Sequence, residues 1–312
     1  MKKIRSLVLV ALTVFTFGIV TGCSNNEVNK DNKEMRVVSS VKGDVEIPVN
    51  PERIVDISGS TEELLILGHK VVATANVDSY ETDKLPSYLG NDLGDTKIVG
   101  HYMMDTMDIE AILSVNPDVI IMAERQEKIY DQLKEIAPVV MIKDSVNDWR
   151  TKLTDVAKVF DDEETANKWL SRYDEKAKKL GEEIKEANGQ DKTYVTVLPS
   201  SGQFMVFTDA GLGTIINDDM GLARPTKLPV QDSITLPTVS IEGLAEIDAD
   251  HIIVIATESD KQDLANSTVW PEIRAVKDGN VTILNATPFF GQSYNPVGKE
   301  LLLESIKAEM VK

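Results

Sequence analysis

One segment of this chain occurs twice, and the repeat restricts the possible folds more than any other feature. Residues 108–123 read DIEAILSVNPDVIIMA, and residues 240–256 read SIEGLAEIDADHIIVIA. Each copy has a helix-capping residue, an Ile-Glu pair, apolar residues at helical spacing, a turn that ends in Asp, and an apolar run typical of a buried strand. A second helix-then-strand match follows each copy at the same offset. The repeat therefore predicts two lobes built on one plan.

Short β-branched runs alternate with helical segments along the rest of the chain. The runs that predict strands are 53–57, 70–75, 119–123, 139–142, 193–198, 251–256 and 280–284. Strands separated by helices indicate parallel sheets. Between the two copies, residues 161–189 carry apolar side chains at helical spacing amid dense charge, which predicts one long helix. The predicted fold class is α/β, with two Rossmann-like lobes with parallel sheets joined by one long α-helix.

The N-terminus has the pattern of a lipoprotein signal peptide. Three basic residues precede an apolar run at residues 7–20, which is shorter than a comfortable membrane span. The letters VTGC at residues 20–23 resemble a lipobox. Cys23 is the only cysteine, so it cannot form a disulfide within this chain. We expect a signal peptide at 1–22, an acyl anchor on Cys23 on the extracytoplasmic face of the cell membrane, and a polar tether at 23–35.

The predicted long helix sets the boundaries of the two lobes. We expect an N-terminal lobe at 36–160, the linking helix at 161–189 and a C-terminal lobe at 190–312. A packed helix between lobes would hold them nearly fixed, so a cleft between them should close little.

The 312 residues include 33 Lys and Arg against 51 Asp and Glu, a net charge of −18. This excess of acid argues against a nucleic-acid partner.

The lipobox and the repeat, together with three further segments, resemble the substrate-binding lipoproteins of bacterial ABC importers, in the helix-linked class that binds ferric siderophores, haem and cobalamin. The segments that carry the resemblance are NPERIVDISGSTEELLILG at 50–68, VGHYMMDTMDIEAILSVNPDVII at 99–121, SIEGL at 240–244, and WPEIRAVKDGNV at 270–281. The resemblance covers nearly the whole chain. It implies two α/β lobes with a ligand held between them, and delivery to an ABC permease without chemistry of the protein's own.

The resemblance also gives a role to two glutamates at equivalent places in the repeat. In this family, residues at the positions of Glu110 and Glu242 contact arginines on the two permease subunits. A two-lobed protein that docks on a pseudo-two-fold permease needs one anion on each lobe, which fits these positions. The alternative is that each glutamate only stabilises the first turn of its helix.

Ligand contacts in such a fold come from loops at the carboxyl ends of strands. The candidates in these loops are Ser60, Tyr80, His101, Tyr102, Arg125, Trp149, Phe290 and Tyr294. Ferric tris-catecholates and citrate-type chelates are anionic and call for several Lys or Arg together. The loops offer Arg125, with Lys227 as a weaker candidate. The sequence therefore favours a ferric tris-hydroxamate siderophore, with Arg125 donating to the iron-bound oxygens and Tyr294 as the preferred aromatic contact.

Other interpretations stay open at this point. Arg125 can be a solvated residue at a helix start, and the Phe residues beside Tyr294 can belong to the core. Haem is the alternative ligand, because His101, Met103, Met104 and Met107 lie in one loop, although haem propionates also call for basic partners. A secreted enzyme or an adhesin lipoprotein is more distant, since no G-x-S-x-G elbow and no P-loop occur. We expect no cofactor, no directly bound metal, and a monomer.

Overall fold

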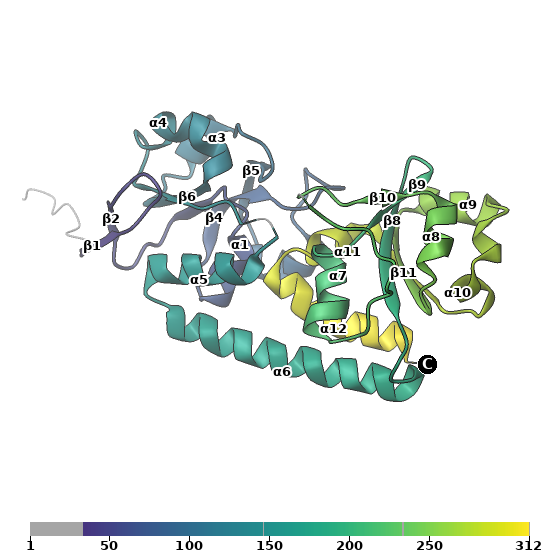
Figure 1. The fold of residues 1–312 in the computed structure, drawn as a ribbon. Helices are drawn as coiled ribbons and strands as arrows, with labels where there is room; N and C mark the ends of the chain where they lie inside the picture. The colour runs from purple at the N-terminus through teal and green to yellow at the C-terminus, as the bar shows by residue number, and fades with distance from the viewer. Residues whose placement is uncertain (1–33, 146, 233, 312) are drawn as a thin grey trace, which may run out of the picture. The chain divides into compact units, whose positions relative to one another are not determined.

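Two five-stranded sheets, one in each lobe, carry the fold (Figure 1). The computed structural model describes residues 34–145, 147–232 and 234–311. The signal peptide, Cys23 and most of the tether lie outside these residues. Among the helices described, none combines the length and the apolar composition that crossing a membrane requires.

The N-terminal sheet is entirely parallel, with strand order β5-β4-β3-β6-β7. Its strands are β3 (Ile54–Asp56), β4 (Val71–Asn76), β5 (Lys97–His101), β6 (Val119–Ala123) and β7 (Val139–Ile142). A separate antiparallel hairpin of β1 (Met35–Val38) and β2 (Val45–Pro48) precedes this sheet. The sequence analysis predicted four of the five sheet strands but neither β5 nor the hairpin.

The C-terminal sheet has the order β10-β9-β8-β11-β12. Its strands are β8 (Tyr194–Ser200), β9 (Gln203–Val206), β10 (Thr238–Val239), β11 (His251–Ala256) and β12 (Val281–Asn285). Strands β8, β11 and β12 are parallel, but β9 is antiparallel to both β8 and β10. The three predicted strands of this lobe are parallel as expected, but the sequence analysis missed β9 and β10, which make the sheet mixed. The cause is the two-residue turn Ser201-Gly202, in which both residues have positive φ, 50° and 79°, as a tight hairpin requires.

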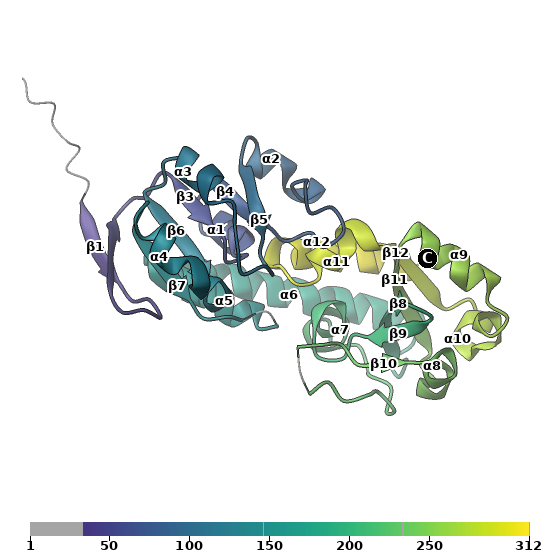
Figure 2. The same ribbon diagram turned by 90° about the horizontal axis from the view of Figure 1, so that it is seen from above.

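Helices cover both sheets and join them (Figures 1 and 2). In the first lobe they are α1 (Thr61–Ile66), α2 (Gly90–Leu93), α3 (Ile109–Ser114), α4 (Tyr130–Leu133) and α5 (Trp149–Phe160), with the short turns η1 (Ser87–Leu89) and η2 (Glu124–Ile129). The second lobe has α7 (Gly211–Thr214), α8 (Ile241–Ile247), α9 (Glu258–Asn266), α10 (Arg274–Lys277) and α11 (Ala286–Gln292), with η3 (Ile215–Asp219) and η4 (Trp270–Glu272). Between them runs α6 (Glu163–Asn188), and α12 (Pro296–Met310) ends the chain.

The long helix α6 spans 26 residues and lies along both lobes (Figure 1). Acidic residues occupy its first turn, where they favour a helix N-terminus, and Gly189 follows its end. It buries one face, formed by Ala166, Trp169, Tyr173, Ala177, Leu180, Gly181 and Ile184. The predicted fold class, two α/β lobes joined by one long helix, is confirmed.

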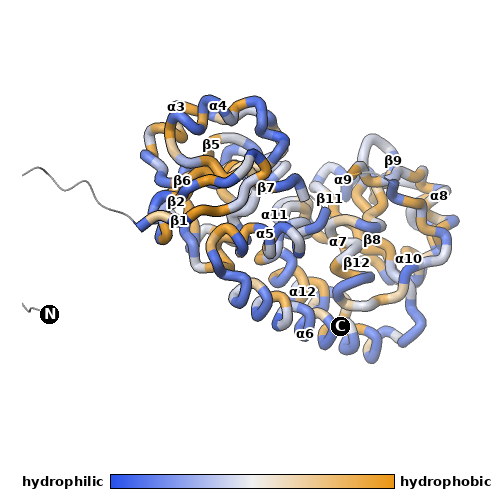
Figure 3. The backbone as a smooth tube through the Cα atoms, turned by 60° about the vertical axis from the view of Figure 1, so that its left-hand side comes forward, coloured by the Kyte–Doolittle hydropathy of each residue, from blue (hydrophilic) through white to orange (hydrophobic). Residues whose placement is uncertain are grey.

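One apolar core is shared by the two lobes. It contains Ile54 and Ile121 of the first sheet, Trp169 of α6, Ile253 of the second sheet and Leu303 of α12. Two further clusters belong to one lobe each, on the other faces of the two sheets. Figure 3 shows the hydrophobic strands inside and the hydrophilic outer turns of α6. Helix α12 packs on both α6 and α1: its first turn contacts Glu62 of the first lobe, and Met310 at its end lies beside Asn188 at the end of α6.

Candidate functional site

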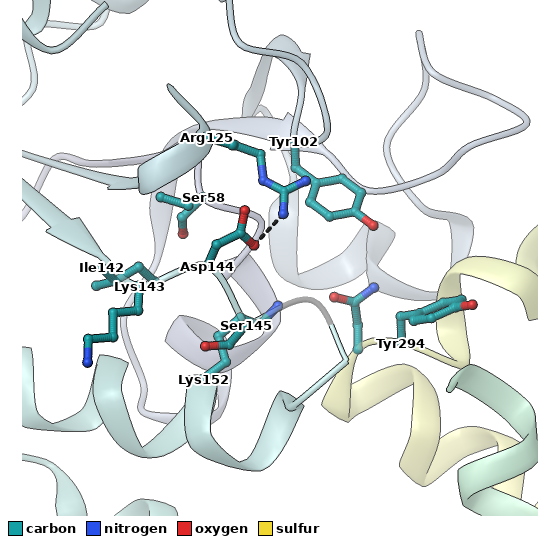
Figure 4. A pocket seen from close by; sticks show the side chains of 11 residues that line it. Ser58, Tyr102, Arg125, Ile142, Lys143, Asp144, Ser145, Lys152 and Tyr294 are labelled. Carbon is teal, nitrogen blue, oxygen red and sulfur yellow. Dashed lines mark hydrogen bonds and ion pairs between the residues drawn. The ribbon is translucent and has the colours of Figure 1, made fainter. Parts of the chain in front are cut away.

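A narrow cleft lies between the strand ends of the N-terminal sheet and the turn that joins α11 to α12 (Figure 4). The residues that line it are Ser58, Tyr102, Ala123, Arg125, Ile142, Lys143, Asp144, Ser145, Lys152, Tyr294 and Asn295. Most of them follow the carboxyl ends of β3, β5, β6 and β7, which is where parallel α/β sheets bind ligands. Of the eight predicted ligand contacts, the structure brings Tyr102, Arg125 and Tyr294 together here.

Arg125 is the second residue of η2, which follows directly on β6, and its side chain is held from two sides. One guanidinium nitrogen pairs with a carboxylate oxygen of Asp144, as the dashed line in Figure 4 shows. The other lies 2.7 Å from the sulfur of Met103, and the guanidinium carbon lies 5.7 Å from the centre of the Tyr102 ring. Arg125 is therefore a fixed donor at the cleft, and its charge is balanced by Asp144.

Lys152 is a second cation at the cleft. It comes from α5, and its Nζ lies 3.0 Å from Oε1 of Glu63 and donates to the carbonyl of Gly59 at 2.8 Å. The Glu63 side chain is fully buried, and that of Lys152 is 11% exposed. Burial opposes the charge of Lys152, but the adjacent Glu63 outweighs it and raises the pKa of Lys152. Lys152 is thus charged and already paired.

A buried hydroxyl network supports the cleft behind Ser58. The Oγ atom of Ser58 lies 2.6 Å from Oδ1 of Asp56 and 2.8 Å from Oγ of Ser60. Thr61 donates to the other carboxylate oxygen of Asp56 at 2.7 Å. Burial raises the pKa of Asp56, against the lowering effect of these hydroxyl donors. Ser60, a predicted contact, is fully buried and lies in this supporting network rather than on the cleft surface.

Aromatic rings form the C-terminal wall of the cleft. The ring centres of Tyr294 and Phe290 lie 5.4 Å apart, and Phe290 meets Tyr80 of the first lobe edge to face at 5.7 Å. Burial raises the pKa of Tyr294, so its phenol stays neutral at physiological pH. Phe290 and Tyr80 are not among the cleft-lining residues, and they instead join the two lobes beside Tyr294.

Two other predicted contacts lie apart from the cleft lining. Trp149 is buried in the shared core, where its ring meets those of Trp169 and Tyr173 at 6.1 and 5.1 Å. His101 ends β5 next to Tyr102, and its Nδ1 accepts from the N–H of Met103 at 3.3 Å. Burial lowers the pKa of His101, which favours the neutral ring. Within the part of the chain that the structure describes, no group of three or more His, Cys, Asp or Glu side chains could hold a metal ion.

Glu110 and Glu242 occupy equivalent positions on α3 and α8. Each is the second residue of its helix and is exposed. The capping residues are Asp108, which accepts from the N–H of Ala111 at 2.9 Å, and Ser240, which accepts from the N–H of Gly243 at 3.2 Å. Because Asp108 and Ser240 already cap the two helices, neither glutamate is needed as an N-cap. The glutamates stay candidates for contact with a partner.

Of the four charged residues that line the cleft, sequence analysis predicted only Arg125. Asp144 follows β7 in a segment that gave no motif. Lys152 and Glu63 lie in helices where their neighbours in the sequence suggest solvated surface charges. The sequence signal that could have identified Asp144 is its place directly after a predicted strand, beside Lys143 and Ser145. No local signal marks the pair of Lys152 and Glu63, because the two residues meet only when α5 packs on α1.

Comparison with known proteins gives consistent results. A family model described as periplasmic binding protein matches residues 54–288. The chain is 29% identical over 300 residues to the probable siderophore-binding lipoprotein YfiY of Bacillus subtilis, with 90% of each chain covered. It is 30% identical over 310 residues to the iron(3+)-hydroxamate-binding protein FhuD of the same organism, with 94% of each covered.

Solved structures show the same fold. A FhuD fold-family periplasmic binding protein from Bacillus subtilis, described as a component of a ferrichrome ABC transporter, has a TM-score of 0.70 at 27% identity, with 88% of this chain and 99% of that chain covered. SirA of Staphylococcus aureus complexed with staphyloferrin B has a TM-score of 0.71 at 24% identity, with 88% and 98% covered.

Proposed function

This chain belongs to the periplasmic binding protein family, and we propose that it captures a ferric hydroxamate siderophore in the cleft around Arg125 and delivers it to an ABC permease. Several relatives are named for siderophore or iron-hydroxamate binding, which supports this ligand class. Other relatives are named for Fe(3+)-citrate and petrobactin, so the choice among siderophores depends on the cleft of this chain.

The observation that carries the proposal is the balance of charge at the cleft. Arg125 is paired with Asp144, and Lys152 is paired with Glu63. A tris-catecholate carries three negative charges, and these paired cations could neutralise it only by giving up their partners, which for Lys152 would leave the buried carboxylate of Glu63 unpaired. A ferric tris-hydroxamate is neutral or cationic and imposes no such cost. Lys143 remains at the exposed rim as a further cation.

Four cleft residues have a part in this proposal. Arg125 donates to the iron-bound oxygens of the hydroxamate groups, which carry partial negative charge. Asp144 keeps the guanidinium in place in the absence of ligand. Tyr102 and Tyr294 offer ring faces from opposite walls, and their hydroxyls are neutral donors.

A titration with four classes of ligand tests this function. Calorimetry or Trp fluorescence is followed as a ferric tris-hydroxamate, a ferric tris-catecholate, a ferric citrate chelate and haem are added to the purified protein. We expect the tightest binding for the tris-hydroxamate. Binding of catecholates alone would overturn the ligand assignment, and tight binding of haem alone would move the site toward His101 and the neighbouring methionines.

The anchor is tested separately. We propose that Cys23 carries the lipid that holds the protein on the extracytoplasmic face, in line with relatives named as lipoproteins. The Cys23→Ala variant should appear in the soluble fraction with unchanged affinity for the siderophore, because a polar tether separates the anchor from the binding domain. A variant that stays in the membrane fraction would show that another segment anchors the protein.

A further inference from the structure

The first turn of α12 is capped by a residue of α1 and not by its own N-cap. Asn295 precedes α12 but makes no capping hydrogen bond to it, and its Nδ2 donates instead to the carbonyl of Gly291 at 2.9 Å. Glu62 of α1 supplies the missing acceptor: its Oε2 accepts from the N–H of Gly298 at 2.9 Å. Gly298 is the third residue of α12, so its N–H is one of the four that a helix leaves free at its start.

Glu62 makes this contact from a fully packed position. It is 2% exposed, and its other carboxylate oxygen accepts from the hydroxyl of Tyr88 at 2.5 Å. The titratable groups that face it are Tyr88 of η1, Glu63 of α1 and Lys152 of α5. The charged residue of α12 nearest to Gly298 in the sequence is Lys299. Its Nζ lies 3.1 Å from the hydroxyl of Thr214 in the C-terminal lobe. Burial raises the pKa of Glu62 to about 7, although the hydrogen bonds from Tyr88 and Gly298 oppose the shift.

The capped turn is coupled to the cleft through tight packing. A Cβ atom on Gly298 would lie 2.4 Å from the Cα of Gln292, so α11 and α12 are in close contact at this point. The turn between Gln292 and Gly298 contains Tyr294 and Asn295, which line the cleft. A shift of the first turn of α12 would therefore move the C-terminal wall of the cleft.

We propose that Glu62 is a positioning residue for ligand binding: it caps α12 from the opposite lobe and holds Tyr294 and Asn295 in place. The effect on the ligand rests on the proposed function, whereas the cap itself does not. The neutral acid can keep both contacts, because its carbonyl oxygen accepts from Gly298 and its hydroxyl faces that of Tyr88.

The packing of α1 on α12 should also depend on pH, and linkage gives the direction of this dependence. If α1 and α12 separate, water reaches Glu62 and its pKa returns toward the ordinary value of 4.5. The ionised form therefore favours separation, and the protonated form favours the packed arrangement. For a pKa of about 7 when packed, the equilibrium for separation should rise about tenfold between pH 6 and pH 8.

Hydrogen exchange of the Gly298 amide tests the cap without any ligand. After correction for intrinsic exchange, protection in the wild-type protein should fall about tenfold from pH 6 to pH 8. The Glu62→Gln variant keeps an acceptor but cannot ionise, so its protection should stay constant. The matched control is Glu164→Gln, at an exposed acid in the first turn of α6, which should behave as wild type. Equal pH dependence in wild type and Glu62→Gln would overturn the proposal.

Binding of ferrichrome, a neutral ferric tris-hydroxamate, tests the effect on the cleft. Glu62→Ala should weaken binding at least fivefold through faster dissociation, Glu62→Gln should recover most of the loss, and the pH dependence between 6 and 8 should disappear in Glu62→Gln. Unchanged dissociation in both variants would overturn the positioning role. If the alanine variant does not fold, the pH profile of the glutamine variant decides. If the wild-type protein does not bind ferrichrome, the choice of hydroxamate fails, and the exchange experiment still decides the cap.

Discussion

The two lobes share a helix-and-strand unit but contribute unequally to the cleft. The unit of α3 and β6 in one lobe matches that of α8 and β11 in the other, and each unit carries an exposed glutamate at the second position of its helix. Nine of the eleven cleft-lining residues nevertheless precede α6 and belong to the first lobe, and the other two are Tyr294 and Asn295. The repeated unit thus places equivalent glutamates on the outer surface of the two lobes, but the set of residues that lines the cleft is not repeated.

The strand that differs between the lobes explains much of this inequality. In the first lobe, β3 ends in a loop that leads into α1, and this loop supplies Ser58 to the cleft. In the second lobe, β8 occupies the corresponding place in the sheet, but the chain reverses at Ser201-Gly202 and returns as β9. A two-residue turn leaves little room for a ligand-contacting loop. The hairpin therefore removes from the second lobe one of the loops that the first lobe uses.

The largest effect is expected when the guanidinium of Arg125 is removed from the first lobe. Arg125→Ala should weaken binding of a ferric tris-hydroxamate at least tenfold, because charge-assisted hydrogen bonds contribute about 1.5–3 kcal/mol each. Arg125→Lys should recover only part, since an ammonium group cannot present a planar pair of donors. The control is Arg224→Ala in the second lobe, where the guanidinium pairs with Asp209 and Asp218 outside the cleft lining.

In the control variant, calorimetry should give affinity within about twofold of wild type. If Arg125→Ala keeps near-native affinity for every hydroxamate, Arg125 does not belong to the site. If Arg224→Ala weakens binding as much as Arg125→Ala does, the second lobe contributes more to binding than the cleft lining indicates.

The next test asks whether the two lobes are equivalent on their outer surface. Glu110→Ala and Glu242→Ala should each lower siderophore uptake by cells about threefold or more, and the purified variants should keep ligand affinity within about twofold. The loss should be similar for both, because the two side chains occupy the same helix position. Glu246→Ala, at an exposed acid on α8, is the matched control. Loss of ligand binding in the purified double variant would contradict a docking role.

The sequence was informative where a pattern is local. The repeat predicted the α3–β6 and α8–β11 units, and the dense charge with apolar spacing predicted α6 to within two residues at its start and one at its end. The hairpin at Ser201-Gly202 was missed although a Ser-Gly pair between two apolar runs is a turn signal, because the alternation of strands and helices elsewhere favoured a parallel sheet.

The cleft was harder to predict because its contacts join distant segments. Arg125 comes soon after a predicted strand and Tyr294 lies in a turn-rich stretch, so both could be identified from the sequence. Asp144 and the Lys152–Glu63 pair are defined by packing between elements far apart in the chain. Trp149 shows the opposite case: its expected place in a loop after a strand made it a candidate contact, but the shared core buries it.

A smaller effect is expected at the C-terminal wall. Tyr294→Ala should weaken binding of a ferric tris-hydroxamate about three- to fivefold, because it removes a ring that packs on Phe290 and that we propose as a ligand contact. Tyr294→Phe keeps the ring and should change affinity by about twofold or less. Calorimetry distinguishes the two outcomes. If Tyr294→Phe loses more affinity than Arg125→Ala, a hydroxyl contact from the α11–α12 turn dominates binding. That result would contradict the inference that the first lobe contributes most of the binding.

The smallest effect concerns the turn that makes the lobes differ. Gly202 has a φ of +79°, which a residue with a Cβ adopts at a cost of about 1–2 kcal/mol, so Gly202→Ala should lower the free energy of unfolding by about that amount. The matched control is Gly90→Ala in the first lobe, where φ is −55° and no neighbouring atom lies within 4 Å of the place that a Cβ would take. That variant should be more stable than wild type by about 0.4–1 kcal/mol, because alanine restricts the unfolded chain. Urea denaturation measures both changes, and siderophore affinity should stay constant in both because neither glycine lines the cleft. If Gly202→Ala leaves stability unchanged but weakens binding, the β8–β9 turn takes part in the ligand site. The hairpin would then itself be a binding loop of the second lobe, contrary to the inference that it replaces one.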